Sequence, residues 1–318
     1  MLLLDEAATR ANLPMPALIA ALRAMFAAGC EMPMRHHHTI TTPTGEAATL
    51  LLMPAWQAGR HLGVKIVGVF PGNSALGLPA VSGAYVLMSG STGEIQANID
   101  GGELTARRTA AASALAASYL AREDAHTLVI AGTGRLCANL AEAHCAVRPI
   151  RRVLVWGRNR DHARAAAGRI RLAGVTAEAA PDLAAAVQAA DIVSCATLSS
   201  EPLVRGDWLR PGTHVDLVGA FTPSMRESDD EAMRRASVFV DTRAGATKEA
   251  GDIVQAVASG ALRPGDIRAD LFDLCRGVHG GRHGRDEITL FKSVGAALED
   301  LAGAVLAFER AHNVGEGK

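Results

Sequence analysis

The stretch TLVIAGTGRL, Thr127–Leu136, decides the fold because an apolar run of strand length passes directly into closely spaced glycines. Gly132 and Gly134 suit a tight turn from a strand into a helix, where the backbone can approach a pyrophosphate and the helix N-terminus stabilises its charge. The alternative is a glycine-rich turn that binds nothing. We favour a dinucleotide-binding loop because this turn opens an apolar helix and stands first in a series of similar units.

The series continues downstream as apolar runs that alternate with helical stretches. These runs are RVLVW (152–156), DIVSCA (191–196), THVDLVGA (213–220) and SVFVD (237–241). Strands that alternate with helices predict a doubly wound parallel sheet of the Rossmann type. Upstream, residues 1–30 have the periodicity of one or two helices, and residues 34–101 contain short β-type runs between turn clusters, which favours antiparallel hairpins.

The C-terminal stretch ITLFKSVGAALEDLAGAVLAFERA (288–311) has the pattern of a long amphipathic helix that packs back on the first domain. A chain of 318 residues is also long for one compact domain. We therefore predict an α/β protein with two domains. One is a discontinuous α+β domain of residues 1–120 and 290–318, and the other is a Rossmann domain of residues 121–289.

Composition excludes several classes of partner. Lys and Arg number 32 against 33 Asp and Glu, so no overall field attracts nucleic acid or an anionic membrane. The five cysteines lack CxxC spacing, and the histidine tracts at 36–38 and 279–283 lack the spacing of a strong metal site, so we expect no disulfide framework and no metal. The N-terminus has no signal-peptide pattern and no apolar run is long enough to cross a bilayer, which predicts a cytoplasmic protein.

The end of the second Rossmann strand indicates which dinucleotide is bound. NAD-binding loops usually carry an acid here, which accepts hydrogen bonds from the ribose 2′-hydroxyl. In VLVWGRNR (153–160) that place is taken by Gly157, followed by Arg158, Asn159 and Arg160. A guanidinium binds a 2′-phosphate that a carboxylate would repel, so we predict NADP(H) in preference to NAD(H). The alternative is a solvated turn in an arginine-rich chain.

Basic residues in the first domain indicate a site for an anion. Lys65 lies within the apolar run GVKIVGVF, where a buried ammonium needs an anionic partner, and a substrate carboxylate could be that partner. Arg107 and Arg108 follow Thr105, a candidate N-cap, and would therefore lie in the first helical turn. The helix dipole disfavours cations at this position unless they share an anion. Arg35 could converge on the same place. Structural ion pairs are the alternative for each of these residues.

Several motifs taken together resemble the ornithine cyclodeaminase and μ-crystallin family. They are LLLMPAW, GVKIVGVFPGN, LTARRTAAASALAASYLA, IAGTGRLCANL, VLVWGRNR, ADIVSCAT, PGTHVDLVGA and FKSVGAALEDLAGA, which follow the family's order along most of the chain. The resemblance implies a homodimer whose first domain, completed by the C-terminal helix, binds substrate and dimerises. It also implies a small amino- or imino-acid substrate.

The resemblance further implies roles for individual residues. Arg35, Lys65 and Arg108 would hold a substrate carboxylate. The cofactor would be bound by Thr109 and the loop Gly132, Thr133, Gly134, Arg135 and Leu136 at its phosphates, by Arg158 and Asn159 at the adenosine ribose, and by Ala196, Thr197, Leu198, Val218, Gly219 and Ser293 around the nicotinamide. The arginine at the second strand is similar to the NADPH-using μ-crystallin branch.

Two departures from the ornithine cyclodeaminases concern the acids that handle ornithine. Leu51 stands where those enzymes have a glutamate before the LMP triplet, and Phe221 stands where they have an aspartate after the fifth strand. Neither side chain can bind an ammonium by charge or exchange a proton. A pocket lined by Leu51 and Phe221 should instead prefer an apolar or cyclic side chain.

The leading hypothesis is an oxidoreductase that uses NADPH to reduce a ketimine or imino acid next to its carboxylate, or a related amino-acid dehydrogenase. Lys65 is a candidate proton donor to the nitrogen. The alternatives are an ornithine cyclodeaminase, which forms proline and ammonia, and a protein that binds NADPH without catalysis.

Overall fold

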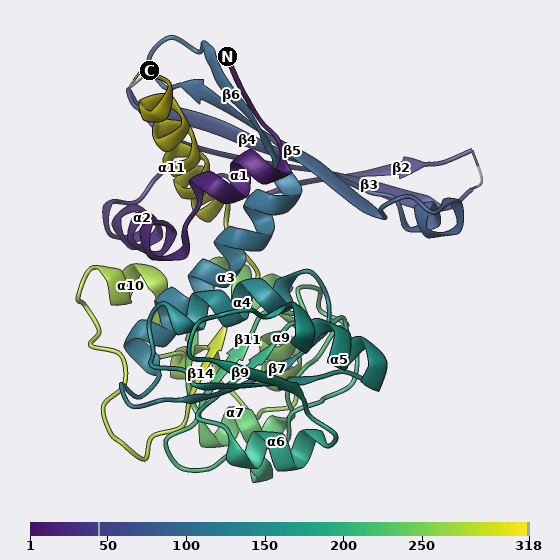
Figure 1. Cartoon of the computed structure of the whole chain (residues 1–318), viewed down its shortest axis with the longest axis vertical. Helices are drawn as coiled ribbons and strands as arrows, with labels where there is room; N and C mark the ends of the chain where they lie inside the picture. The colour runs from purple at the N-terminus through teal and green to yellow at the C-terminus, as the bar shows by residue number, and fades with distance from the viewer. Residues whose placement is uncertain (44, 317–318) are drawn as a thin grey trace. The chain divides into compact units, whose positions relative to one another are not determined.

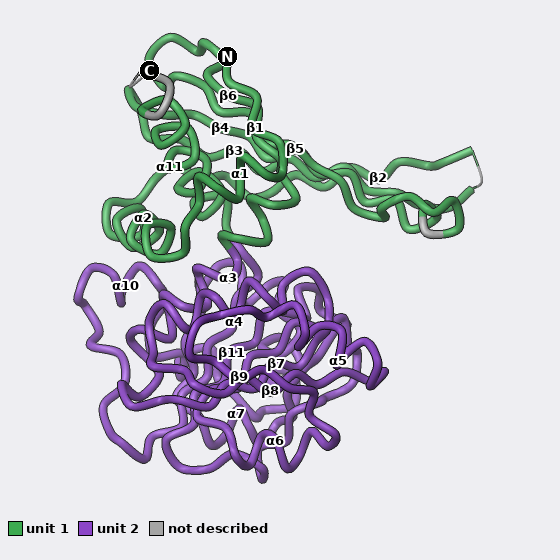
Figure 2. The backbone as a smooth tube through the Cα atoms, in the orientation of Figure 1, with its two compact units in different colours: residues 1–108, 296–318 green, residues 109–295 purple. Residues whose placement is uncertain are grey.

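The computed structural model describes residues 1–43 and 45–316. The chain forms two compact units, one of Met1–Arg108 with Ala296–Lys318 and the other of Thr109–Gly295 (Figure 2). We call them unit 1 and unit 2. Unit 1 is built from two separate stretches of the sequence because the C-terminal helix α11 (Ala297–Glu316) belongs to it.

Unit 1 contains a six-stranded sheet in the order β1-β6-β5-β4-β3-β2 (Figure 1). Its neighbouring strands are antiparallel except for β1 and β6, which are parallel. The predicted hairpins are therefore confirmed, although the N-terminus begins with a strand and not a helix. The strands are β1 (Leu2–Leu4), β2 (His36–Thr41), β3 (Ala47–Gln57), β4 (His61–Val69), β5 (Val81–Ser89) and β6 (Ile95–Asp100).

The two faces of this sheet differ in burial. Residues alternate between faces along each strand, and Met53, Lys65 and Tyr85 lie opposite one another on β3, β4 and β5 and are all buried. Helix α11 packs on this side of the sheet and also contacts α2 (Met15–Ala28), while α1 (Glu6–Asn12) contacts α11 and β6. Lys65 is thus a buried cation among packed apolar side chains.

The helix that carries Arg108 begins earlier than the sequence suggested. Helix α3 spans Gly101–Leu120, and the Asp100 side chain accepts a hydrogen bond from the backbone N–H of Glu103 at 2.6 Å. Thr105 is therefore inside the helix and is not its N-cap, and Arg108 lies beyond the first turn. An aspartate caps a helix as well as a threonine does, so the choice between these two starting points depended on the preceding strand β6.

Unit 2 contains an eight-stranded parallel sheet in the order β13-β12-β14-β11-β10-β7-β8-β9, which confirms the doubly wound α/β fold. Figure 1 shows α4 on one side of this sheet and α6 and α7 on the other. The strands are β7 (Thr127–Ala131), β8 (Arg152–Trp156), β9 (Thr176–Ala179), β10 (Ile192–Cys195), β11 (His214–Leu217), β12 (Ser237–Val240), β13 (Ala269–Asp270) and β14 (Thr289–Lys292). The helices are α4 (Leu136–Cys145), α5 (Arg160–Arg169), α6 (Leu183–Ala189), α7 (Asp230–Arg235), α8 (Arg243–Glu249), α9 (Gly251–Ala258) and α10 (Leu271–Cys275), and three short 3₁₀ turns (Pro71–Leu76 in unit 1, Gly206–Trp208 and Pro264–Asp266 in unit 2) complete the described elements.

Strand β14 corrects the prediction of one long C-terminal helix. Residues 289–292 are fully buried and pair in parallel with both β11 and β12, so this part of the stretch belongs to the Rossmann sheet. A short apolar run buried on both faces has no strand periodicity, and its pattern cannot be told from that of a buried helix segment. The helix itself begins at Ala297.

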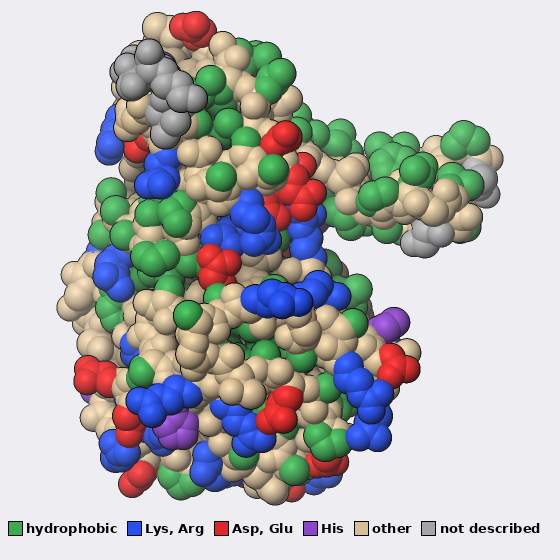
Figure 3. All heavy atoms as spheres, in the orientation of Figure 1, with side chains coloured by type: hydrophobic (Ala, Val, Ile, Leu, Met, Phe, Trp, Pro, Cys, Tyr) green, Lys and Arg blue, Asp and Glu red, His purple; other side chains and the backbone are tan. Residues whose placement is uncertain are grey.

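Three surface features bear on possible partners. Within residues 1–43 and 45–316, no single helix is long and apolar enough to cross a membrane, and α1 with α2 meets that criterion only as a pair bent by 75°. In the same ranges no group of three or more His, Cys, Asp or Glu side chains is arranged to hold a metal ion. Figure 3 shows basic and acidic side chains interspersed on the visible face of unit 2.

Candidate functional site

Four charged side chains meet in the interior of unit 1, and we call them the Lys65 cluster. Lys65 Nζ lies 2.8 Å from Asp300 Oδ2, and Arg108 Nε lies 2.9 Å from Asp300 Oδ1. Arg108 Nη1 also lies 2.6 Å from Glu299 Oε2. The Asp300 carboxylate therefore contacts both of the cations for which the sequence predicted substrate binding. The anionic partner of Lys65 in the structure is thus an aspartate of the protein itself.

The four members of the Lys65 cluster come from three elements of unit 1. Lys65 projects from β4 on the face of the sheet that α11 covers, and Arg108 comes from α3. Glu299 and Asp300 lie in the first turn of α11. Acids in a first turn are stabilised by the helix dipole, so the same two residues both favour the start of α11 and neutralise the buried cations.

Burial and neighbouring charges perturb the ionisation of these groups in opposite directions. The pKa of Lys65 is lowered to about 8, chiefly by burial and also by the charges of Arg108 and Arg35, while Asp300 acts in the opposite direction and raises it. Burial by itself would raise the pKa of Asp300, but Arg108 and Lys65 hold it below its usual value. The influence of Arg35 on Lys65 shows that this third predicted residue lies within electrostatic range of the cluster.

The Lys65 cluster keeps donors that could bind a further anion. A lysine ammonium has three N–H donors, and in the described part of the chain Asp300 Oδ2 is the acceptor that Lys65 contacts. Arg108 directs Nε and Nη1 at the two acids, which leaves Nη2 without a protein acceptor within the described residues. Arg35 adds positive charge within electrostatic range of Lys65.

Leu51 lies near this cluster on the same sheet face. It pairs with Val67 in the β3–β4 ladder, two positions from the pair formed by Met53 and Lys65, and it is half-buried. Residues two apart on a strand point to the same side. The side chain at the place where a cyclodeaminase glutamate would stand is thus apolar and faces the side that carries Lys65.

The glycine loop of unit 2 has the geometry that the sequence indicated. Gly132 has φ of 132°, and a Cβ there would lie 2.5 Å from the carbonyl oxygen of Ala196, so glycine is required. A Cβ on Gly134 would meet nothing within 4 Å, which leaves open space over the backbone just before α4 begins at Leu136. Open backbone at a helix N-terminus fits a pyrophosphate, so the loop is compatible with a dinucleotide.

The loop after β8 lies beside this glycine loop. A Cβ on Gly157 would lie 2.6 Å from Thr133 Cγ2, so the two loops are in close contact. Arg158 is exposed, and the side chain of Asn159 caps α5 by accepting hydrogen bonds from the backbone N–H groups of Asp161 and His162. Arg158 is thus available to a ligand, whereas the Asn159 oxygen is already used in capping.

The residues expected around the nicotinamide follow three neighbouring strands at the same edge of the sheet. Parallel strands end together at one edge, where ligands of doubly wound folds bind. Ala196, Thr197 and Leu198 follow β10, Val218 and Gly219 follow β11, and Ser293 follows β14. Phe221 lies just beyond Gly219 and is 46% exposed, and Thr109 lies in α3 within unit 2.

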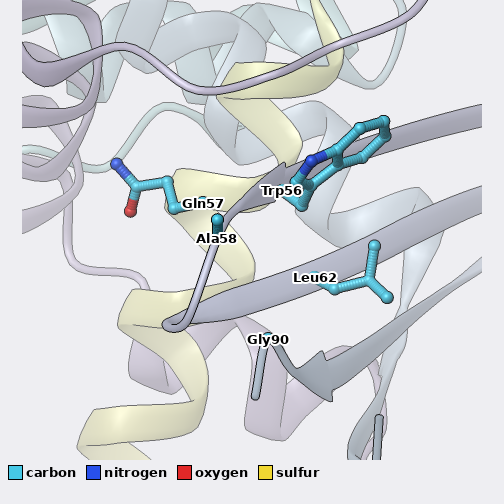
Figure 4. A pocket seen from close by; sticks show the side chains of 5 residues that line it. All are labelled: Trp56, Gln57, Ala58, Leu62 and Gly90. Carbon is cyan, nitrogen blue, oxygen red and sulfur yellow. The ribbon is translucent and has the colours of Figure 1, made fainter. Parts of the chain in front are cut away.

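A cavity of about 350 Å³ lies elsewhere in unit 1. It is lined by Trp56, Gln57, Ala58, Leu62 and Gly90 at the turn between β3 and β4. Figure 4 shows the side chains of Trp56 and Leu62 extending to one side of this hairpin and Gln57 to the other. Trp56 and Leu62 lie opposite each other on the face turned away from Lys65, so this cavity is separate from the cluster.

The sequence did not point to Glu299 or Asp300. Their positions at the start of an amphipathic helix have an ordinary explanation in the helix dipole, which hid their second role. One signal was present: two adjacent acids stand in a helix that is otherwise rich in alanine and leucine. Acids that face a core are rarely left without a cation.

The fold and these two groups of residues define a two-unit protein with a Rossmann dinucleotide-binding unit and a separate buried cluster of charged side chains. A family model described as the Ornithine cyclodeaminase/mu-crystallin family matches residues 5–315. The chain belongs to this family, which confirms the resemblance seen in its motifs.

Characterised relatives and solved structures give the family context. The chain is 44% identical over 262 residues to the Delta(1)-pyrroline-2-carboxylate reductase of Paracoccus denitrificans, covering 81% of each chain. It is similar to the structure of the Thermococcus litoralis Delta(1)-pyrroline-2-carboxylate reductase in complex with NADH and L-proline, with a TM-score of 0.91, 34% identity and coverage of 99% of this chain and 98% of that one. It also matches a probable ornithine cyclodeaminase from Bordetella pertussis Tohama I, with a TM-score of 0.86, 31% identity and coverage of 99% and 98%.

Proposed function

We propose that this protein is an imino-acid reductase that reduces the C=N bond of a cyclic imino acid such as Δ1-pyrroline-2-carboxylate. The observation that carries the proposal is the Lys65 cluster, in which Asp300 holds Lys65 and Arg108 side by side while both keep donors for another anion. The reductases of Paracoccus and Thermococcus support the same reaction class. Leu51, an apolar side chain on the Lys65 side of the sheet, supports an uncharged ring in preference to the cationic side chain of ornithine.

Substrate binding would use the charges of unit 1. Arg108 Nη2 and the N–H donors of Lys65 would bind the carboxylate of the imino acid, and Arg35 would add positive charge nearby. Charge-assisted hydrogen bonds to a carboxylate are stronger than neutral ones. Because Asp300 contacts both cations, it would fix their separation before substrate arrives and so lower the cost of ordering them.

The reduction adds a hydride to the imine carbon and a proton to the imine nitrogen, which gives a secondary amine. The nicotinamide cofactor supplies the hydride when it is bound at the glycine loop of unit 2. Lys65 is the proton donor that we propose, because its pKa of about 8 keeps it mostly protonated at neutral pH yet makes it a stronger acid than an ordinary lysine. Asp300 would remain ionised and hold the ammonium in place.

The test of this function is cofactor oxidation with pyrroline-2-carboxylate and piperideine-2-carboxylate, run separately with NADPH and NADH. We expect oxidation with at least one of the two imino acids and formation of the corresponding cyclic amino acid. No oxidation of either cofactor would refute the proposal. Proline and ammonia released from ornithine would establish the cyclodeaminase alternative, and NADPH binding without turnover of any of these compounds would establish the non-catalytic one.

We further propose that NADPH is preferred to NADH, because Arg158 is exposed and follows Gly157 at the end of β8, where an acid would favour NADH. The Thermococcus relative was solved with NADH, so the preference must be measured for this chain. Arg158→Asp should lower kcat/KM for NADPH by about tenfold or more and change that for NADH much less. Arg171→Asp, an equal charge change at another exposed arginine of unit 2, should leave the ratio unchanged; a ratio unaffected by Arg158→Asp would refute the assignment.

We also propose that unit 1 forms a homodimer through the sheet face turned away from Lys65. The side chains of this face are apolar and only partly buried, in contrast to the buried opposite face: Leu52, Pro54, Trp56, Leu62, Val64, Val86 and Met88. A broad apolar surface of this kind usually marks an interface. The mass in solution by light scattering should be that of two chains, and Val64→Asp, which places a charge in the middle of this face, should give a monomer with the same secondary structure.

A further inference from the structure

A second buried charge network lies in unit 2, under the loops expected to surround the nicotinamide. Lys292, the last residue of β14, is fully buried, donates to the carbonyl oxygen of Gly219 and has its Nζ 3.3 Å from Asp252 Oδ2. Asp252 Oδ1 in turn accepts hydrogen bonds at 2.9 Å from the backbone N–H groups of Glu227 and Ser228. The network therefore ties the end of β14 to the loop after β11.

Glu227 extends the same network to the loop after β10. Its Oε1 accepts hydrogen bonds from the backbone N–H of Thr197 at 2.7 Å and from the Thr197 hydroxyl at 2.8 Å. A Cβ on Gly219 would lie 2.4 Å from this Oε1 and 2.1 Å from the Thr197 carbonyl oxygen. Glu227 thus fills the space between Thr197 and Gly219, and no larger residue could replace this glycine.

The backbone next to this contact is strained. Ala220 has φ of 50°, and among the described residues it is the non-glycine residue with positive φ. Such a conformation is unfavourable for a residue with a side chain and persists only where the surrounding structure holds it in place. Here Gly219 is held by Lys292 on one side of the turn, and the carbonyl oxygen of Ala220 accepts from Gly251 on the other. The turn that leads into Phe221 is therefore held in one shape.

Stability alone is a poor explanation for three buried ionisable groups. An apolar core of the same volume is commonly as stable as a buried ion pair or more so, because desolvation offsets the attraction. Burial raises the pKa of Glu227 to about 7, and Asp252 raises it too, so holding this carboxyl in place costs free energy at neutral pH. What the network gains is the linkage of loops from three separate strands.

We infer that Glu227, Asp252 and Lys292 are positioning residues that hold Thr197 and Gly219 where the nicotinamide ring binds, and so set the position from which hydride is transferred. The inference rests on the proposed function only in that unit 2 must bind a nicotinamide dinucleotide. The inference concerns only the nicotinamide half of the dinucleotide. The network lies after β10, β11 and β14, whereas the adenosine half is assigned to the loops after β7 and β8.

The experiment compares affinity for NADPH with affinity for 2′,5′-ADP, which lacks the nicotinamide half, by calorimetry on the full chain. Glu227→Ala removes both hydrogen bonds to Thr197 and should weaken NADPH binding by about tenfold relative to 2′,5′-ADP. Glu227→Gln keeps an acceptor oxygen and should restore most of this ratio. NADH and ADP form the corresponding pair if NADH is the bound cofactor.

Two further variants separate positioning from a loss of folding. The double variant Lys292→Met with Asp252→Asn releases Gly219 and removes both charges of the Lys292–Asp252 pair together, and it should show the same selective loss. Asp191→Ala is the matched control, because Asp191 is a buried carboxylate that accepts two backbone N–H bonds at the opposite, amino-terminal edge of the sheet. It should lower the melting temperature and leave the ratio of affinities unchanged.

The outcomes distinguish this inference from the proposed function. If the unmodified protein binds neither NADPH nor NADH, the proposed function fails. If it binds a dinucleotide, and Glu227→Ala and the double variant lose affinity equally for the whole molecule and for its adenosine fragment, or lose none, the positioning role is overturned.

Discussion

Asp300→Asn tests whether one carboxylate organises the Lys65 cluster. The substitution keeps the shape of the side chain but removes the charge that lies 2.8 Å from Lys65 and 2.9 Å from Arg108. Removing one partner of a buried ion pair typically costs about 3–5 kcal/mol of unfolding free energy. The cost should lie at the lower end of this range for two structural reasons.

The first reason is that Arg108 keeps Glu299 at 2.6 Å as an anionic partner. The second is that Lys65 can release its proton, because a pKa of about 8 means that deprotonation at pH 7 costs only about 1.4 kcal/mol. We therefore expect a loss of about 3 kcal/mol, which corresponds to a fall in melting temperature of about 4–5 °C for a protein of 318 residues.

The effect on activity should depend on pH. Without Asp300 the pKa of Lys65 should fall below its value of about 8, since Asp300 is the cause that raises it. The alkaline limb of kcat/KM for pyrroline-2-carboxylate, which we expect near pH 8 in the unmodified protein, should then move to lower pH. The assay is NADPH oxidation at saturating cofactor between pH 5.5 and 9.5.

A double variant gives the control. Lys65→Met combined with Asp300→Asn removes the unpaired ammonium, so it should recover about 2 °C of melting temperature at pH 7 relative to Asp300→Asn alone. It should be inactive because it lacks the proposed proton donor. An alkaline limb that stays near pH 8 in Asp300→Asn would refute the coupling between Lys65 and Asp300. No recovery in the double variant would refute the argument that an uncompensated buried cation causes the instability.

Three further predictions concern individual side chains. Lys65→Arg should abolish the alkaline limb near pH 8, because a guanidinium stays charged, and should lower kcat if Lys65 supplies the proton; an unchanged pH profile of kcat/KM would contradict this. Arg108→Lys should raise KM for the imino acid by about tenfold, because the planar fork is lost, without changing the calorimetric affinity for NADPH; an equal loss of both would point to a general structural role. Burial raises the pKa of Glu227 from 4.5 to about 7, so the folded state binds this proton more tightly than the unfolded chain and loses stability as pH rises between these values. The melting temperature of Glu227→Gln relative to the unmodified protein should therefore increase from pH 5 to pH 8, and a constant difference in thermal melts would show that Glu227 does not titrate in this range.

Much of unit 2 could be predicted because its signals are local. Gly132 and Gly134 stand at the turn where the backbone demands glycine or open space, and the strands around them are short apolar runs bounded by turns. Strand β14 was not predicted because its four residues are all buried and therefore show no alternation of apolar and polar residues, and because they lie shortly before a helix. The start of α3 was missed for a related reason, since Asp100 and Thr105 are both acceptable caps and only the end of β6 selects the first.

For the Lys65 cluster, the sequence indicated the cations but not the acids that pair with them. A lysine within an apolar strand shows that an anion is required, but no pattern shows which group supplies it. Asp300 lies far along the chain from Lys65, on a helix whose first-turn acids have an ordinary local explanation. The same is true of Lys292, which sits in a run that looks like helix and meets Asp252 and Gly219 only after the sheet has formed.

The sequence by itself determined the parallel α/β unit, the glycine loop, the missing acid after β8 and the need for an anion at Lys65, because each of these depends on neighbours within a few residues. The tertiary structure alone decided that Asp300 joins Lys65 to Arg108 and that Glu227, Asp252 and Lys292 link the ends of β10, β11 and β14. These contacts form between distant segments, because a charge that packing buries costs free energy unless an opposite charge from another segment pairs with it. A local sequence pattern cannot predict these contacts, because they depend on segments that lie far apart in the sequence.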